Sequence, residues 1–196
     1  MGTQEQEVPI YLTEEEYLIQ ELKAESKSEY YDGKVVAMAG AQDEHNLIVV
    51  NLIYELSKCT RENSTNCVVY ANDMLLKLAH CNMFVYPDVM VVCKKRQIEK
   101  KSRNGLDALL NPSVIVEVIS KSTKHKDQVT KRDCYLELKS LKQYILVDSQ
   151  KKDIIIYSKN KDKEWVIKKY KPENDTIKVE NCIITISDIY RNVEFE

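Results

Sequence analysis

The segment Ser113-Val114-Ile115-Val116-Glu117-Val118-Ile119 is a β-prone apolar run interrupted by a single acid, and it is the clearest indication of the fold. An apolar run of this length after the turn signal Asn111-Pro112 predicts a strand that is buried on both faces. A charged carboxylate in such a strand costs several kcal/mol unless a cation, hydrogen bonds or a proton compensates it. We therefore expect a compensating group beside Glu117.

A second acid interrupts another apolar segment. Asp88 follows Phe84-Val85-Tyr86-Pro87 and precedes the apolar residues 89 to 93. Two such acids on neighbouring strands would form a pocket for a divalent cation, because hard cations prefer oxygen ligands. The alternative is that each acid lies at a strand end and is bonded to backbone, or is paired with a lysine.

The rest of the chain predicts a mixed sheet flanked by helices. Thr13 and Glu16 have the spacing of a capping box, which predicts a helix over residues 14 to 25. Asp32-Gly33 predicts a type I′ hairpin turn. The class is therefore α/β (α+β), with an N-terminal helix and hairpin, in one domain over residues 1 to 196. Further helices are expected over 43–61 and 124–138, and strands over 66–78, 84–93, 113–119, 144–147, 154–157 and 165–170.

Composition and cysteine spacing indicate the cellular compartment in which we expect the protein. The longest apolar runs stop within about ten residues, well short of the roughly 20 that cross a bilayer, and residues 1 to 10 have no apolar signal-peptide core. The six cysteines form no C-x-x-C pair and match no zinc template. We therefore expect reduced thiols and a cytoplasmic protein.

The charge is unevenly distributed, although the net charge is only -2. Residues 1 to 50 hold three lysines and eleven acids, whereas residues 94 to 132 hold eleven Lys or Arg and four acids. The basic stretch would supply phosphate contacts on the same side of the sheet as the acids, and an ordinary solvated surface is the alternative. The pI near 6.0 argues against tight non-specific nucleic-acid binding. The candidate contacts are Lys94, Lys95, Arg96, Lys121 and Lys124.

The helix after Glu117 places Asp127, Lys131 and Tyr135 on one face, at spacings of four residues. A helical salt bridge with an aromatic neighbour would explain this pattern. The functional interpretation is that Lys131 reaches over the edge of the sheet to the carboxylates, where its ammonium could hold a phosphate oxygen.

Three further residues are candidates for the same site. Asp73 precedes an alternating segment and could be a third ligand. His45, with Glu44 beside it, begins the long helix and could approach the same end of the sheet. A histidine at a helix start is more often a satisfied polar group than a ligand.

A series of short motifs runs over almost the whole chain, and in this order and spacing they resemble a known family. They are Thr13-x-Glu15-Glu16-Tyr17, Tyr30-Tyr31-Asp32-Gly33, Met38-Ala39-Gly40-Ala41 with Glu44-His45-Asn46, Asp73-Met74, Tyr86-Pro87-Asp88-Val89, Val116-Glu117-Val118-Ile119-Ser120, the helix with Asp127, Lys131 and Tyr135, and Tyr144-x-x-Val147-Asp148. The chain resembles the Uma-two type of restriction endonucleases, a branch of the PD-(D/E)xK nuclease superfamily.

The resemblance implies a restriction endonuclease-like domain and assigns roles by position. The PD of the motif falls on Pro87-Asp88 and the (D/E)xK on Glu117-Val118-Ile119, so Ile119 stands where the lysine belongs. The family places a lysine on the following helix, which matches Lys131.

The implied activity is Mg²⁺-dependent cleavage of DNA, with Mn²⁺ as a possible substitute. Asp88 and Glu117, with Asp73, would hold the metal, and Lys131 would stabilise the transition state. A nuclease that cuts both strands often works as a homodimer. The alternatives are an inactive nuclease-fold protein that serves as a DNA-associated or protein-interaction module, and a metal-dependent hydrolase of another phosphoester.

Overall fold

The computed structural model describes residues 11–63, 65–100, 106–119, 126–171 and 175–195, without the side chains of residues 126–128. The elements in chain order are α1 (Glu14–Lys23), β1 (Ser28–Tyr31), β2 (Lys34–Ala37), α2 (Asp43–Glu62), β3 (Val68–Ala71), β4 (Leu75–Leu78), η1 (Ala79–Cys81), β5 (Met83–Val85), β6 (Val89–Val92), β7 (Ile98–Glu99), β8 (Ala108–Leu109), β9 (Val114–Ile119), α3 (Lys126–Glu137), β10 (Gln143–Asp148), β11 (Ile154–Lys159), β12 (Trp165–Tyr170), β13 (Thr176–Val179), β14 (Cys182–Thr185) and α4 (Ile186–Ile189).

The N-terminal helix and hairpin form as predicted. The Thr13 hydroxyl accepts a hydrogen bond from the Glu16 backbone N–H, and the Glu16 carboxylate reaches back to the Thr13 N–H. In the hairpin turn, Asp32 and Gly33 have φ of 46° and 94°, the left-handed values that a type I′ turn requires.

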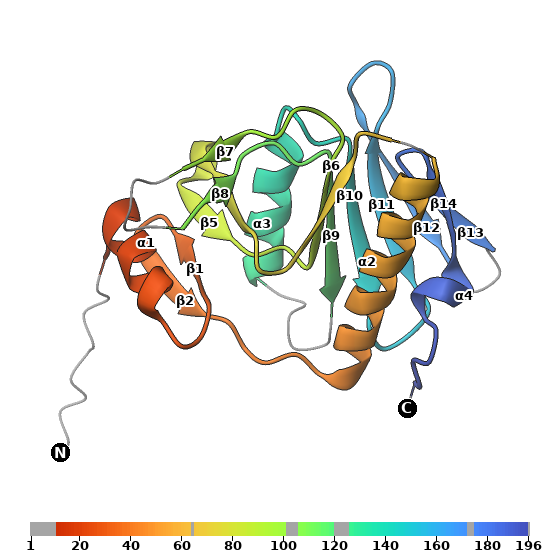
Figure 1. Cartoon of the computed structure of the whole chain (residues 1–196), viewed down its shortest axis with the longest axis horizontal. Coiled ribbons are helices and arrows are strands. Elements are labelled where there is room, and N and C mark those ends of the chain that lie inside the picture. The colour runs from red at the N-terminus through yellow and green to blue at the C-terminus, as the bar shows by residue number, and fades with distance from the viewer. Residues whose placement is uncertain (1–10, 64, 101–105, 120–125, 172–174, 196) are drawn as a thin grey trace.

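Twelve strands form two mixed six-stranded sheets rather than one, and β13 and β14 form a separate two-stranded sheet. The first sheet has the order β2-β1-β5-β4-β8-β7 and the second has β12-β11-β10-β9-β6-β3. Apolar residues of α2 pack with Val114, Val116 and Val118 on one face of the second sheet. On the other face, Tyr135 and Cys134 of α3 pack with Ile115 and with residues of the first sheet. Figure 1 shows α2 and α3 flanking β9, with α3 between the two sheets.

Two strands that the sequence predicts as continuous are broken. The predicted strand 66–78 is divided into β3 and β4 by a turn at residues 72–74. The predicted strand 84–93 is divided into β5, which pairs with β1 and β4, and β6, which pairs with β9 and β3. Pro87 separates them because it has no N–H for a sheet ladder. Residues 86–88 therefore cross from one sheet to the other, which places Asp88 at their junction.

The expectation of reduced thiols is wrong for this structure, in which every cysteine is in a disulfide. The partners are 26, 53 and 123 residues apart, separations that the spacing of neighbouring cysteines along the chain does not reveal. Reduced thiols were the reason for expecting a cytoplasmic protein, so this expectation no longer has their support. The pairs are Cys59–Cys182, Cys67–Cys93 and Cys81–Cys134.

Within the described part of the chain, no helix has the length and apolar character needed to cross a membrane.

Candidate active site

Asp88 lies at the start of β6 and is nearly buried, with 8% of its surface exposed. Its Oδ2 accepts a hydrogen bond from the backbone N–H of Val118 at 2.7 Å, which joins the start of β6 to β9. Its Oδ1 lies 3.2 Å from Nε2 of His45, in the first turn of α2. The candidate His45 thus lies at the same end of the sheet as Asp88.

Glu117 lies in β9 and points to the face that α3 covers. The Tyr135 hydroxyl donates a hydrogen bond to Glu117 Oε1 at 2.8 Å, and Lys131 Nζ lies 3.6 Å from the same oxygen. Lys131 and Tyr135 are one helical turn apart, so both reach Glu117 from one face of α3. The group expected beside the buried acid is therefore present, and it comes from the predicted helix.

A third carboxylate completes this cluster, and the sequence did not identify it. Glu29, in β1, is 7% exposed, and its Oε1 accepts hydrogen bonds from Lys131 Nζ at 2.7 Å and from the Tyr86 backbone N–H at 3.0 Å. Its Oε2 accepts a hydrogen bond from the Tyr31 hydroxyl. Lys131 therefore links an acid of the first sheet, Glu29, to an acid of the second, Glu117. The available signal was an acid inside the β-prone segment Ser28-Glu29-Tyr30-Tyr31, the same anomaly as at Glu117 but in a strand of four residues.

The electrostatics of Glu117 reflect this crowding of acids. Burial raises the pKa of its carboxyl, and the Lys131 ammonium lowers it. The negative charges of Asp88 and Glu29 raise the pKa again, and the result is about 7. One lysine does not balance the nearby acids, so the site is short of positive charge near neutral pH.

Burial acts in the opposite direction on the two basic groups, because it disfavours the charged form of each group. Burial lowers the pKa of the Lys131 ammonium, but the carboxylates of Glu117 and Glu29 more than reverse this and raise it above its ordinary value. Burial also lowers the pKa of the His45 imidazole, while the hydrogen bond and charge of Asp88 raise it, with a net increase. Lys131 is therefore a permanent cation in this site.

Asp73 is not joined to these acids by any described contact. Its carboxylate is 82% exposed, lies in the turn before β4 and forms an ion pair with Lys27. Glu44 is half-buried in the first turn of α2. The roles of both residues stay predictions. Three further candidates, Lys121, Lys124 and the side chain of Asp127, lie outside the described residues.

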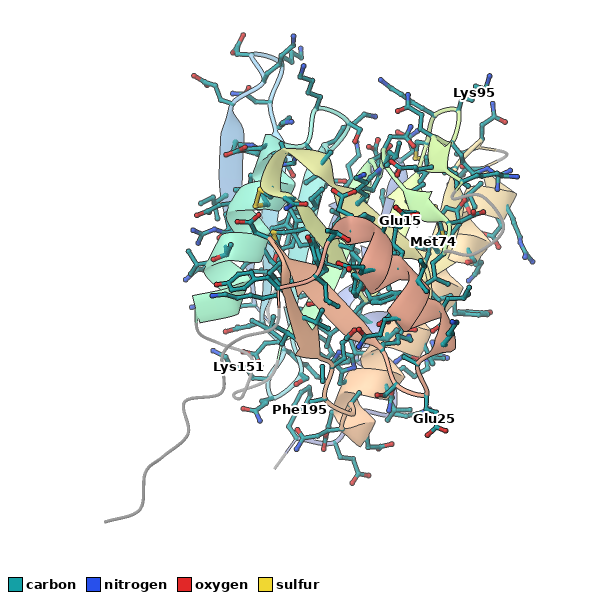
Figure 2. The ribbon with its side chains drawn as sticks, turned by 90° about the vertical axis from the view of Figure 1, so that its left-hand side faces the viewer. Glu15, Glu25, Met74, Lys95, Lys151 and Phe195 are labelled. Carbon is teal, nitrogen blue, oxygen red and sulfur yellow. A yellow bond between two sulfur atoms is a disulfide. The ribbon has the colours of Figure 1, made fainter. Side chains whose placement is uncertain are left out.

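The basic loop after β6 does not lie beside the acids, which corrects the sequence-based expectation. Asp88 comes directly before β6, whereas Lys94, Lys95 and Arg96 come after it. The three cations therefore lie at the opposite end of β6 from Asp88. Because β6 runs antiparallel to β9, they lie beside the start of β9 and not beside its end. Lys151, in contrast, marks the end of the sheet where the acids lie. It follows β10, whose last residue, Asp148, pairs with Ile119 at the end of β9. Figure 2 shows Lys95 and Lys151 on opposite sides of the molecule.

Comparisons with family models, with other sequences and with solved structures agree on one family for this chain. The model of the Uma2 family, described as "Putative restriction endonuclease", matches residues 14–190. The uncharacterized protein slr1290 of Synechocystis sp. (strain ATCC 27184 / PCC 6803 / Kazusa) is 30% identical over 94% of each chain. The uncharacterized protein sll1609 of the same organism is 32% identical over 85% of this chain and 91% of its own.

A solved structure shares the fold. The crystal structure of a "putative nuclease belonging to DUF820" from Anabaena variabilis ATCC 29413 superposes with a TM-score of 0.67, at 17% identity, over 91% of this chain and 97% of that one. The chain has a nuclease-like mixed α and β fold and belongs to the Uma2 family of restriction endonuclease-like proteins. Both the predicted resemblance and the predicted fold class are confirmed.

Proposed function

We propose that this protein is a divalent-metal-dependent endonuclease that hydrolyses DNA phosphodiester bonds at the junction of its two sheets. The observation that carries the proposal is the position of Lys131, whose ammonium lies beside Glu117 although the (D/E)xK lysine is replaced by Ile119. A cation therefore faces the acidic pair from α3 instead of from β9. Action on both strands by a homodimer stays a prediction.

The residues present fit a divalent cation by their charge and chemistry. Asp88 and Glu117 offer carboxylate oxygens, the ligands that Mg²⁺ and Mn²⁺ prefer. Burial, together with the charges of Asp88 and Glu29, raises the pKa of Glu117 to about 7, and a bound cation would stabilise the ionised form of this carboxyl. Among the described residues, the ligand atoms of these two acids and His45 do not lie as a set within 4.8 Å of one another. Water and substrate would supply the remaining ligands, as is usual for Mg²⁺.

Asp88 and Glu117 would hold the metal, which when bound supplies positive charge against the phosphate and the attacking water. The chain's own residues have separate tasks. Lys131 places a permanent positive charge where negative charge grows on the phosphate oxygens. The Tyr135 hydroxyl orients Glu117.

Two further contacts hold these groups in place. The backbone N–H of Val118 fixes one oxygen of Asp88, and Glu29 holds the Lys131 ammonium in the site. Groups that are oriented before the substrate binds need little reorganisation in the transition state.

A binding module that has lost turnover is the second candidate, and one observation favours it. Lys131 Nζ is closer to Glu29, at 2.7 Å, than to Glu117, at 3.6 Å. An ammonium that is already neutralised by an internal partner has less charge to offer a phosphate. The two candidates differ in metal binding and in cleavage, not in fold.

The test combines metal titration by calorimetry with cleavage of a supercoiled plasmid. It uses the wild type, Asp88→Asn and the control Asp162→Asn, whose exposed side chain lies in the loop between β11 and β12. We expect Mn²⁺ binding and nicking by the wild type and the control, and loss of both in Asp88→Asn.

Each other outcome decides between the candidates. DNA binding without metal binding or cleavage would replace the nuclease by the binding module. Cleavage that persists in Asp88→Asn would refute this site. Hydrolysis of a small phosphodiester such as bis(p-nitrophenyl) phosphate, with intact plasmid, would assign a different phosphoester substrate.

A further inference from the structure

A second cluster of metal-binding side chains lies between η1 and α3, and it is built from residues that the acidic site does not use. His80 and Cys81 belong to the short helix η1, and Cys134 belongs to α3. One ring nitrogen of His80 and the sulfurs of Cys81 and Cys134 all lie within 4.8 Å of one another. Among the described residues, no other three His, Cys, Asp or Glu ligand atoms are grouped as closely.

One ring nitrogen of the histidine makes a hydrogen bond of the kind that metal-bound histidines usually make. Nε2 of His80 lies 2.8 Å from the backbone oxygen of Cys134, so the N–H at this position donates to that carbonyl and the lone pair falls on Nδ1. Metal-bound histidines commonly donate the N–H of their other ring nitrogen to a backbone carbonyl, which fixes the orientation of the ring. Glu137 Oε2 lies 3.9 Å from the same Nε2 of His80, and Glu137 does not belong to the close group of ligand atoms.

The donor set selects the metal. Two thiolates and an imidazole are soft or borderline ligands, which favour Zn²⁺ and similar ions over Mg²⁺ or Ca²⁺. Zinc takes four ligands in a tetrahedron with Zn–S distances of about 2.3 Å. We infer that His80, Cys81 and Cys134, with water in the fourth position, form a Zn²⁺ site in the reduced protein.

The Cys81–Cys134 disulfide and the zinc site are alternative states of the same sulfurs. A dithiol reductant gives two electrons and two protons to the disulfide, whose S–S bond opens to two thiols while the reductant becomes a disulfide. Each thiol then loses its proton to solvent as zinc binds the two sulfurs. Among the described residues, neither of the other two disulfides has a histidine in such a group, so we expect them to form no zinc site.

Both states attach α3 to η1 at a position that matters for the acidic site. Cys134 is adjacent to Tyr135 and lies three residues after Lys131, and both of these side chains contact Glu117. Because α3 is anchored by a covalent bond in one state and by a metal in the other, its two functional side chains keep their place under oxidising and reducing conditions.

Cobalt titration tests the inference, because Co²⁺ occupies zinc sites and absorbs by charge transfer only when thiolates bind it. The protein is reduced with tris(carboxyethyl)phosphine and freed of reductant under argon. We expect the reduced wild type to develop the thiolate-to-cobalt absorption with one equivalent of Co²⁺, and the oxidised wild type to develop none. Cobalt held by Asp88 and Glu117 would not produce this absorption.

The variants locate the site. Cys81→Ser should abolish the charge-transfer absorption, His80→Gln should weaken Zn²⁺ binding about 100-fold, and Cys67→Ser, the matched control, should change neither. As a readout without substitution, Zn²⁺ should protect Cys81 and Cys134 of the reduced wild type from alkylation more than the other four cysteines. Absence of the absorption in the reduced wild type, its persistence in Cys81→Ser, or equal alkylation of all six cysteines would overturn the inference.

Discussion

Lys131 Nζ donates a hydrogen bond to Glu29 Oε1 at 2.7 Å, although the two residues are 102 positions apart in the chain. The bond joins α3 to β1 and so connects the first sheet to the helix that covers the second. It also holds the ammonium 3.6 Å from Glu117 Oε1. Glu29 is therefore a positioning residue for Lys131, and the two side chains are expected to affect activity in different ways.

Lys131→Ala should lower turnover by about 100-fold or more, because it removes the preorganised positive charge at the phosphate. Affinity for DNA should change little, since one buried cation contributes little to a surface made of many phosphate contacts. Plasmid nicking and fluorescence anisotropy measure the two effects. Lys139→Ala, an exposed lysine shortly after α3, is the matched control. Equal activity of the two variants would remove Lys131 from the mechanism.

Glu29→Gln should lower turnover less than Lys131→Ala, by about tenfold. The amide oxygen can still accept the hydrogen bond from the Tyr86 backbone N–H, but it no longer carries the charge that raises the pKa of Lys131. The same cleavage assay measures the effect, with Glu25→Gln as an exposed control from the segment before β1. A variant more active than the wild type would show that Glu29 restrains Lys131 rather than positioning it.

Local patterns in the sequence predicted most elements but not their division between two sheets. The capping box at Thr13, the Asp32-Gly33 turn and the apolar run of β9 are local signals, and each formed where expected. The break at Pro87 moved β5 and β6 into different sheets because pairing partners are chosen by tertiary packing. The short strands β7 and β8 carry too few residues to show periodicity.

The residues of the candidate site were predictable where a charged side chain stood in an otherwise apolar segment. An acid in a buried strand marked Glu117, and helical spacing placed Lys131 and Tyr135 on one face. Glu29 was missed because its burial depends on packing between β1 and a helix far along the chain. Cysteine pairing was missed for the same reason, since the nearest pair is 26 residues apart.

The contribution of each disulfide to the free energy of unfolding should increase with the number of residues in the loop that it closes. In the chain-entropy account, the 123-residue separation of Cys59–Cys182 is worth about 5 kcal/mol and the 26-residue separation of Cys67–Cys93 about 3.5 kcal/mol. Urea unfolding of the two double alanine variants, measured under oxidising conditions, should show the larger loss for the pair at 59 and 182. Under reducing conditions the order should disappear, and an order that persists there would assign the losses to packing.

The stability of the metal-free protein should fall as the pH rises through neutrality, because of Glu117. Burial is the largest cause that raises the pKa of this carboxyl, from its ordinary value of 4.5 to about 7. The folded protein therefore holds this proton more tightly than the unfolded chain does. The resulting stabilisation is fully present below about pH 4.5 and is lost as the pH rises through about 7. At about 1.4 kcal/mol for each pKa unit, it amounts to at most about 3 kcal/mol.

Glu117→Gln isolates this contribution, because the amide is similar in shape and cannot ionise. In EDTA, the free energy of unfolding of the variant relative to the wild type should rise by up to about 3 kcal/mol between pH 4.5 and pH 8, as measured by urea unfolding. Mg²⁺ binds the ionised carboxylate, so it should stabilise the wild type at pH 8, have little effect at pH 5, and leave the variant unchanged at both. The exposed control Glu25→Gln should follow the wild type throughout. A difference between variant and wild type that is constant with pH would mean that Lys131 keeps Glu117 ionised across this range, and that the pKa of its carboxyl is not raised in the folded protein.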